Sequence, residues 1–347
     1  MSEPSERMPL IEAARLRVTF PVGNRRLVAV DDVSLSVQSN ETVALVGESG
    51  SGKSTVALTL ARARDPEAGT IRFDGIDITH LRGRALRPFR RRFQLVLQNP
   101  YASLDPRFTV HDVIAEPLRA HRWGNPADVS RRVATLLEQV GLATSAARRY
   151  PAQFSGGQRQ RISIARALAL GPDLVIADEP VTALDVSIQA QIVNLLADIQ
   201  AASGVAYLVI AHDLALVHHI ADRVLVMYLG RVVEEGPIDP LSAEPQHPYT
   251  AALLSATPVP DRDRRRQRIV LRGDPPSAID RPTGCAFHPR CPIARPHCAA
   301  ESPALVDIGA GRRVACFYPG EIGPVLNLRR PARQDDSSEE VACQPST

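Results

Sequence analysis

Lysine is almost missing from this sequence. The 347-residue chain contains 41 lysine and arginine residues, and Lys53 is the single lysine among them. Arginine is therefore used in place of lysine at every basic position except this one. Because a compact ammonium fits among phosphate oxygens better than a planar guanidinium does, this exception indicates a phosphate-binding role for Lys53.

The features of several other protein classes are also lacking. No apolar run approaches the length of a membrane-spanning helix, and residues 1–10 are polar and mixed in charge, so we expect no transmembrane segment and no signal peptide. The net charge of +3 gives no strong attraction to nucleic acid, so we expect no nucleic-acid partner. The expected compartment is the cytoplasm, where the five cysteines should stay reduced.

What is present is organised around one glycine-rich stretch. Residues 47–54 read Gly-Glu-Ser-Gly-Ser-Gly-Lys-Ser and fit the phosphate-binding pattern G-x-x-x-x-G-K-[ST]. An apolar run at 43–46 predicts a strand before it, and residues 55–64 predict a helix after it. Backbone N–H groups and the helix N-terminus would then face a phosphate. The predicted nucleotide-binding residues are Gly47, Glu48, Ser49, Gly50, Ser51, Gly52, Lys53, Ser54 and Thr55.

Polar residues follow further predicted strands. Asp178 and Glu179 come directly after the apolar run 174–177, while Gln98 and His212 follow runs at 93–97 and 205–211. Strands that alternate with helices predict a mostly parallel sheet, and ligands bind at the carboxyl ends of such strands. One carboxylate there can hold Mg²⁺ and another can accept a proton from an attacking water. Together with the P-loop, these residues predict a site for a nucleotide γ-phosphate.

A second glycine-bearing helix start lies at Ser155, Gly156, Gly157 and Gln158. Such an end can also bind an anion, but one nucleotide cannot easily lie on both helix ends. We therefore expect this second end to serve a nucleotide held by a partner subunit.

These motifs, in this order, resemble the ATP-binding subunits of ABC transporters over about residues 11–240. The resemblance implies an α/β P-loop NTPase core with a helical insert, and a head-to-tail dimer that holds two ATP molecules at its interface. It further implies that Ser54, Gln98 and Asp178 serve Mg²⁺ and that Glu179 is the general base. His212 would contact the γ-phosphate, with Gln98 sensing the attacking water. Ser155–Gln158 would close over the partner's ATP, and Asp185 would couple the two sites.

The resemblance narrows at residues 99–106, 177–180, 185–191, 246–250 and 284–292, which look like the ATPases of oligopeptide and dipeptide importers. Among these the chain is most similar to the second of the two paired ATPases, the F-type subunit. This implies import of di- or oligopeptides, with nickel or another small solute as an alternative cargo. Two rivals outside transport are a soluble ABC ATPase and a catalytically inactive iron–sulfur scaffold.

The same resemblance implies the partners and the location of the chain. A paralogous ATPase subunit would complete a heterodimer on two transmembrane permease subunits, with an extracellular or periplasmic solute-binding protein in the complex. The chain would sit peripherally on the cytoplasmic side of the cell (inner) membrane. The expected domains are an ATP-binding domain at 8–245 with a helical insert at about 99–155, an irregular cysteine-containing extension at 246–320, and a disordered tail at 321–347.

Four cysteines gather in the extension, at Cys285, Cys291, Cys298 and Cys316. In a reducing compartment this grouping suggests metal ligation, but the sequence has no C-x-x-C pair of the kind found in zinc ribbons. A four-iron, four-sulfur cluster, which members of the resembling family carry, is the first expectation, ahead of purely structural thiols and of zinc.

The contact with adenine is left open by the sequence. ABC ATPases usually stack an aromatic ring on the base, but residues 24–27 contain none. Phe20 is one candidate, and Arg25 or Arg26 could stack instead.

Overall fold

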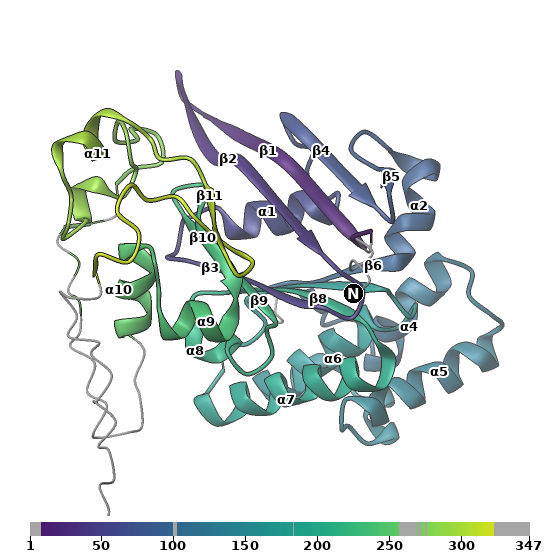
Figure 1. Cartoon of the computed structure of the whole chain (residues 1–347). Helices are drawn as coiled ribbons and strands as arrows, with labels where there is room; N and C mark the ends of the chain where they lie inside the picture. Colours follow the sequence, from purple (N-terminus) through teal and green to yellow (C-terminus); the bar gives the residue numbers. More distant parts are fainter. Residues whose placement is uncertain are drawn as a thin grey trace, which may run out of the picture.

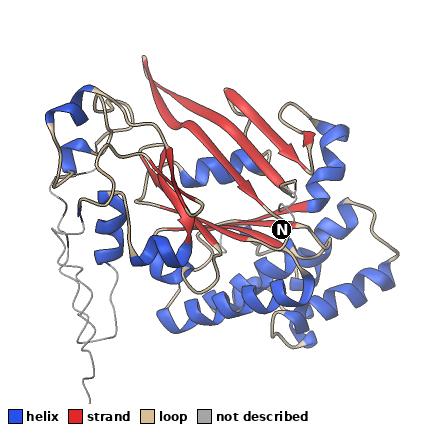
Figure 2. Ribbon diagram, in the orientation of Figure 1, coloured by secondary structure: helices blue, strands red, loops and turns tan. Residues whose placement is uncertain are grey.

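Two β-sheets lie face to face at the centre of the molecule (Figure 1; Figure 2). The computed structural model describes residues 8–99, 103–182, 184–256 and 276–322, together with residues 269, 271, 273 and 274. Figure 1 shows the smaller sheet on one side of the larger one and a layer of helices on the other. The predicted α/β class and P-loop core are confirmed.

The larger sheet contains five parallel strands in the order β6, β7, β8, β3 and β9. Their bounds are β3 Thr42–Val46, β6 Phe93–Val96, β7 Leu174–Asp178, β8 Ala206–Ala211 and β9 Arg223–Tyr228. Every residue of β3, β7 and β8 is buried, as expected for parallel strands that are covered on both faces. Side chains of β3 alternate between two cores, with Leu45 in one and Val46 in the other.

The sheet continues with three antiparallel strands, β10 (Arg231–Pro237), β12 (Arg312–Val314) and β11 (Val306–Gly309). Strand β12 pairs with β10 through Glu234↔Val314 and Glu235↔Arg313. The cysteine-bearing part of the chain is therefore joined to the core sheet by backbone hydrogen bonds.

The smaller sheet is antiparallel, in the order β2-β1-β4-β5. Its strands are β1 Ile11–Val22, β2 Arg25–Val37, β4 Ala68–Phe73 and β5 Ile76–Asp77. Its apolar side chains share one core with β3, β7, β8 and helix α1 (Lys53–Leu60). One face of the parallel sheet is thus covered mainly by the smaller, antiparallel sheet.

Helices cover the opposite face of the parallel sheet. They are α4 (Val110–Ala120), α5 (Pro126–Gln139), α6 (Gly156–Ala167) and α7 (Val186–Ser203), and the short 3-10 helices η1 (Thr144–Arg148) and η2 (Pro151–Gln153) lie between α5 and α6. Asn125 caps α5 with Pro126 at its first position, and Gly141 follows its end. Helix α2 (Gly83–Arg92) lies beside β6.

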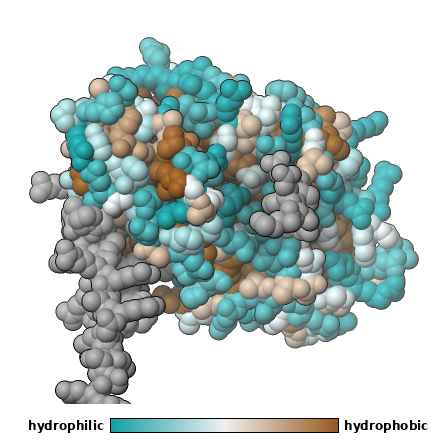
Figure 3. Space-filling view, in the orientation of Figure 1, coloured by the Kyte–Doolittle hydropathy of each residue, from teal (hydrophilic) through white to brown (hydrophobic). Residues whose placement is uncertain are grey.

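Short elements complete the chain: α8 (Leu214–Val217), α9 (Ile238–Ala243), α10 (Pro248–Ala256), η3 (His288–Arg290) and α11 (Pro296–Ala300). Within the described ranges, no helix is both long and apolar enough to cross a membrane. The face drawn in Figure 3 is mainly hydrophilic, with only small separate hydrophobic areas. Residues 323–347 of the predicted tail lie outside the described residues.

Candidate functional site

The P-loop connects β3 to α1, as the sequence predicted. Its backbone passes so close to neighbouring strands that two of its glycines cannot carry a side chain. A Cβ at Gly47 would lie 2.2 Å from the carbonyl oxygen of Met227, and one at Gly52 would lie 2.1 Å from that of Ala29. Gly52 also has a φ of 103°, which glycine adopts readily and other residues do not.

Lys53 lies at the start of α1, and its side chain is buried. Its ammonium donates hydrogen bonds to the carbonyl oxygens of Gly47 at 2.7 Å and Glu48 at 2.9 Å. Burial lowers the pKa of Lys53, while the charges of Glu179, Asp178 and Glu48 oppose that shift. The single lysine of the chain is therefore held directly over the loop.

Ser54 and Asp178 meet between α1 and the carboxyl end of β7. The Ser54 hydroxyl donates to Oδ1 of Asp178 at 3.0 Å. Burial raises the pKa of Asp178, and the charge of Glu179 adds to this, against the Ser54 hydrogen bond and the charge of Lys53. A hydroxyl and a carboxylate at this distance are the hard oxygen donors that suit Mg²⁺.

Glu179 follows β7 in an unusual backbone conformation, with a φ of 45°. Its N–H donates to the carbonyl oxygen of Ile210 in β8 at 3.0 Å. Its Oε2 accepts hydrogen bonds from Nε2 of Gln98 at 2.7 Å and from the hydroxyl of Thr182 at 3.0 Å. A left-handed glutamate is rare, and such positions often occur at functional sites. The sequence did not predict Thr182 as a site residue, because no motif marks it. Only its hydrogen bond to Glu179 places it in the site.

The structure brings together Gln98, Glu179, Asp178, Ser54 and Lys53, because the strands β6, β7, β8 and β3 are parallel neighbours and end at one edge. His212 follows β8 at the same edge and is exposed. In the described part of the chain, no hydrogen bond joins His212 to another of these residues.

Ser155–Gln158 lie apart from this group. The Ser155 hydroxyl accepts from the N–H of Gln158 and the Gln158 side chain accepts from the N–H of Ser155, which forms a capping box at the start of α6. A Cβ at Gly157 would lie 2.5 Å from Cγ2 of Ile188, so this glycine is required for packing against α7. Among the described residues, no hydrogen bond joins this segment to the chain's own P-loop.

An aspartate directly before an apolar helical pattern predicts an N-cap, but Asp185, which is exposed at the N-cap position of α7, makes no capping hydrogen bond with its side chain. Thr55, the last predicted P-loop residue, lies in the first turn of α1, where its carbonyl oxygen accepts from the Thr59 hydroxyl at 2.7 Å.

Two side chains of the C-terminal region contact the P-loop, and the sequence did not reveal this. The hydroxyl of Tyr249 accepts from the N–H of Glu48 at 2.7 Å. Arg290 donates from both terminal nitrogens to the Glu48 carboxylate, at 2.7 and 3.1 Å. Both residues belong to motifs that carried the family resemblance, at 246–250 and 284–292, but those motifs did not indicate a contact with the P-loop.

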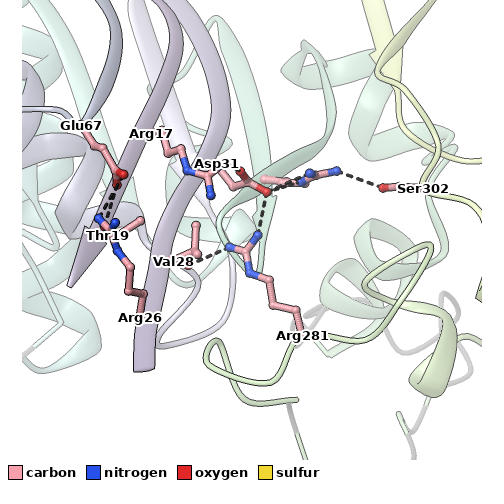
Figure 4. Close-up of polar contacts among 9 residues, drawn as sticks. Arg17, Thr19, Arg26, Val28, Asp31, Glu67, Arg281 and Ser302 are labelled. Carbon is pink, nitrogen blue, oxygen red and sulfur yellow. Dashed lines mark hydrogen bonds and ion pairs between the residues drawn. The ribbon is translucent and has the colours of Figure 1, made fainter. Parts of the chain in front are cut away.

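A second attachment of the C-terminal region lies at Asp31 of β2 (Figure 4). Its carboxylate accepts from Arg231 and Arg281, each at 2.8 Å, and Arg17 lies 3.5 Å away. Arg281 also donates to the carbonyl oxygen of Val28 at 2.7 Å. Burial would raise the pKa of Asp31, but the hydrogen bond and charge of Arg231 and the charges of Arg281 and Arg17 lower it overall.

The candidates for the adenine contact differ in their surroundings. The guanidinium of Arg64 lies 4.3 Å from the centroid of the Phe20 ring. Arg25 forms an ion pair with Asp280 at 2.8 Å, and Arg26 forms one with Glu67 at 3.0 Å. Each of the three candidates therefore has a charged neighbour, and Phe20 is the one among them that offers an aromatic ring.

The four cysteines of the C-terminal region line one small cavity, together with His247, His288 and Tyr318 among others. The N–H of Cys285 donates to the carbonyl oxygen of Cys298 at 2.8 Å, which holds two of the four segments together. Burial raises the pKa of Cys291 to about 12 and that of Cys316 to about 11. Within the described ranges, no three His, Cys, Asp or Glu side chains are arranged to hold a metal ion.

Comparisons with known proteins agree with this geometry. The ABC transporter family profile matches residues 30–182, and the profile "Oligopeptide/dipeptide transporter, C-terminal region" matches residues 233–298. A probable peptide ABC transporter ATP-binding protein of Sinorhizobium fredii, y4tS, is 52% identical over 88% of this chain and 86% of its own. The dipeptide transport ATP-binding protein DppF of Haemophilus influenzae is 44% identical over 91% of this chain and 99% of its own.

A solved structure shares the fold. The ATP-binding cassette MJ0796, a dimer in a post-hydrolysis state bound to ADP and Pi, superposes with a TM-score of 0.61 and 29% identity. The match covers 66% of this chain and 98% of MJ0796.

Proposed function

Because this chain belongs to the ABC transporter ATPases, we propose that it hydrolyses ATP to drive the import of di- or oligopeptides. The observation that carries the proposal is the single edge at which Lys53, Ser54, Asp178, Glu179 and Gln98 meet. The peptide cargo is supported by the match of residues 233–298 to the oligopeptide/dipeptide region and by the names of its relatives.

In the proposed mechanism the P-loop N–H groups and Lys53 bind the phosphates of ATP. Ser54 and Asp178 would hold Mg²⁺, which supplies positive charge to the β- and γ-phosphate oxygens. Glu179 orients a water molecule and accepts its proton as the water oxygen bonds to the γ-phosphorus. The bond from that phosphorus to the β,γ-bridging oxygen breaks, and ADP and phosphate are released. Gln98 and Thr182 fix the Glu179 carboxylate through their hydrogen bonds to Oε2.

We propose that Phe20 stacks on the adenine. It lies in β1, and the neighbouring strand β2 contacts the P-loop where Ala29 approaches Gly52. A flat apolar ring suits any purine face.

Completion of the site requires a second ATPase subunit. Ser155–Gln158 make no hydrogen bond to the chain's own P-loop in the described residues, which supports a role on a partner's ATP. Asp185 and His212 are both exposed, so they are accessible to the partner subunit and to the γ-phosphate respectively. We propose a heterodimer in which this chain is the F-type subunit, since DppF is among its relatives.

The remaining partners are two permease subunits and an external solute-binding protein, with the chain on the cytoplasmic side of the cell membrane. The helical insert, at about residues 99–155, is the proposed contact with the permeases. Leu97 and Phe108 flank its start and are 38% and 51% exposed, so apolar surface is available there for such a contact. The domain division at 8–245 and 246–320 remains part of this proposal.

We further propose that the four cysteines hold a four-iron, four-sulfur cluster. The convergence of Cys285, Cys291, Cys298 and Cys316 on one cavity supports this. Zinc bound by the thiolates and thiols without any metal are the alternatives, and the iron and sulfide content of the purified protein distinguishes them.

Reconstitution tests the function directly. The chain, its paralogous ATPase and the two permeases would be placed in proteoliposomes with the binding protein and a labelled tripeptide inside, and release of the tripeptide into the medium would be measured on ATP addition outside. ATP added outside acts only on complexes whose ATPase subunits face outward. The controls are vesicles without ATP and vesicles loaded with nickel instead of peptide. Nickel transport without peptide transport would identify the alternative cargo, and ATP hydrolysis unaffected by either solute would overturn the importer assignment.

A further inference from the structure

Glu48, the second residue of the P-loop, is held at three of its groups. Its N–H donates to the Tyr249 hydroxyl at 2.7 Å, and its carbonyl oxygen accepts from Lys53 at 2.9 Å. Its carboxylate accepts two hydrogen bonds from Arg290, at 2.7 and 3.1 Å. Two of the three partners thus lie at least 200 residues further along the chain.

The two distant partners rest on the same support. The Tyr249 side chain is fully buried, and its ring centroid lies 4.7 Å from that of Tyr228 and 5.4 Å from that of Phe287. The N–H of Arg290 donates to the carbonyl oxygen of Phe287 at 3.0 Å, within the tight turn that contains η3. The hydroxyl and the guanidinium that reach Glu48 are therefore fixed with respect to each other.

Glu48 also places a negative charge in a loop that must accept phosphates. An unpaired carboxylate there would repel a polyphosphate and attract the Lys53 ammonium away from it. The Arg290 side chain is 8% exposed and that of Glu48 is 26% exposed, so solvent screens this pair only in part. A bidentate guanidinium neutralises the carboxylate and fixes its direction.

We propose that Tyr249 and Arg290 are positioning residues of the nucleotide site, which act through Glu48. Tyr249 fixes the backbone at the start of the P-loop through the N–H of Glu48, and Arg290 cancels the charge of the Glu48 side chain. The C-terminal extension is then a working part of the ATP site. This inference rests on the proposed use of the P-loop as the nucleotide site.

Binding of MgADP to the full-length chain, measured by titration calorimetry, tests the charge pair because ADP is not consumed. We expect Arg290→Gln to weaken binding by about tenfold or more, because it leaves the Glu48 carboxylate without its cationic partner. The double variant Arg290→Gln/Glu48→Gln should return to within about threefold of the wild type, since the repelling charge is gone. A merely structural role for Arg290 would give no such recovery, and that result would overturn the proposal.

Tyr249→Phe tests the second contact and is independent of the folding of the Arg290 variants. It keeps the buried ring and removes one oxygen, so we expect an affinity reduced by about threefold to tenfold at a nearly unchanged melting temperature. Wild-type affinity in this variant would overturn the role of Tyr249.

Two further variants separate this inference from the proposal beneath it. Arg295→Gln removes an exposed arginine of the same extension, which pairs with Glu321, and should bind MgADP like the wild type. Lys53→Ala should lose most binding if the P-loop is the nucleotide site. Wild-type affinity in Lys53→Ala would overturn the site itself, whereas impaired Lys53→Ala together with normal Arg290→Gln would overturn the inference alone.

Discussion

The Gln98 side-chain amide donates a 2.7 Å hydrogen bond to the Glu179 carboxylate and so connects the ends of the neighbouring strands β6 and β7. The same carboxylate oxygen also accepts from Thr182. Within the described ranges the other carboxylate oxygen of Glu179 accepts no hydrogen bond, so it can accept a proton from water. Any movement of the segment after β6 changes the direction of this carboxylate, because Gln98 stands at its start.

Glu179→Gln should lower ATP turnover by roughly 10²–10⁴-fold, the usual contribution of a general base. An amide can still accept the Gln98 and Thr182 hydrogen bonds, but it cannot accept a proton from water. MgATP affinity should stay close to that of the wild type. Phosphate release by the purified heterodimer measures this, with the exposed Glu138→Gln on α5 as the matched control. Wild-type turnover in Glu179→Gln would mean that another group is the base.

Phe20→Ala should weaken MgADP binding by about tenfold, because stacking of a base on an aromatic ring contributes about 1–3 kcal/mol. Phe20→Tyr should bind like the wild type, since it keeps the ring. Val22→Ala, an exposed position on the same strand, is the control and should have no effect. Equal MgADP affinities for Phe20→Ala, Phe20→Tyr and Val22→Ala would show that the adenine does not stack on Phe20.

Gly157→Ala should destabilise the fold, because the added methyl group would lie 2.5 Å from Cγ2 of Ile188. The expected loss is about 1–3 kcal/mol in the free energy of unfolding, as for other overpacked sites, measured by urea denaturation. The double variant Gly157→Ala/Ile188→Ala relieves the clash and should recover part of that loss. If Gly157→Ala is as stable as the wild type but lowers ATPase activity, the glycine serves the ligand and not the packing.

Asp31 should make the stability of the chain depend on acid pH. Its pKa is lower in the folded protein than its ordinary value of 3.8, so its contribution is present above about pH 4 and is lost as the pH falls through the folded pKa. Asp31→Asn should be less stable at pH 7 by about 2 kcal/mol, the scale of hydrogen bonds to a charged group, and should lose less on acidification.

The neighbouring Asp32→Asn is the matched control for Asp31. Asp32 is exposed and has a φ of 57°, a conformation that asparagine tolerates. Its unfolding free energy should follow that of the wild type across the acid range. If the unfolding free energies of the wild type and Asp31→Asn change in parallel between about pH 2 and 5, the arginines around Asp31 do not stabilise its ionised form.

Anaerobically purified protein should contain about four iron atoms and four labile sulfides per chain if the cysteines hold the proposed cluster. Serine at any of the four positions should lower that content. Cys343→Ser is the control; it lies in the predicted tail, outside the described residues, and should leave the iron content unchanged. Colourless protein that contains one zinc ion would exclude the cluster.

The P-loop and the parallel strands could be predicted because their signals are local. Apolar runs such as 174–177 announce buried strands, and glycine spacing announces a phosphate loop, so Asp178, Glu179 and Gln98 were placed at one edge from the sequence. Helix caps are equally local signals, since Asn125 before Pro126 starts α5 and Gly204 ends α7. Asp185 shows the limit of such reasoning, since it occupies the cap position of α7 without making the cap.

Contacts between distant parts of the chain could not be predicted in this way. Glu48 and Arg290 are separated by 242 residues, and nothing in either segment names the other. The stacking of the antiparallel sheet on the parallel one depends similarly on which apolar faces meet, as with Leu16 and Leu45 in one core. Thr182 entered the site only because the left-handed turn at Glu179 carries the chain back toward its carboxylate.

The pairing of β12 with β10 moves the open edge of the core sheet from β10 to the short strand β11. Strand β10 would otherwise be the last strand of the core sheet, with open backbone donors and acceptors on its outer side. An open edge of this kind is a template for strand addition by another molecule and a common start of aggregation. A shortened chain that ended before residue 306 would keep Tyr249 and Arg290 but would expose the edge of β10, so its solubility would depend on a segment that looks dispensable in the sequence.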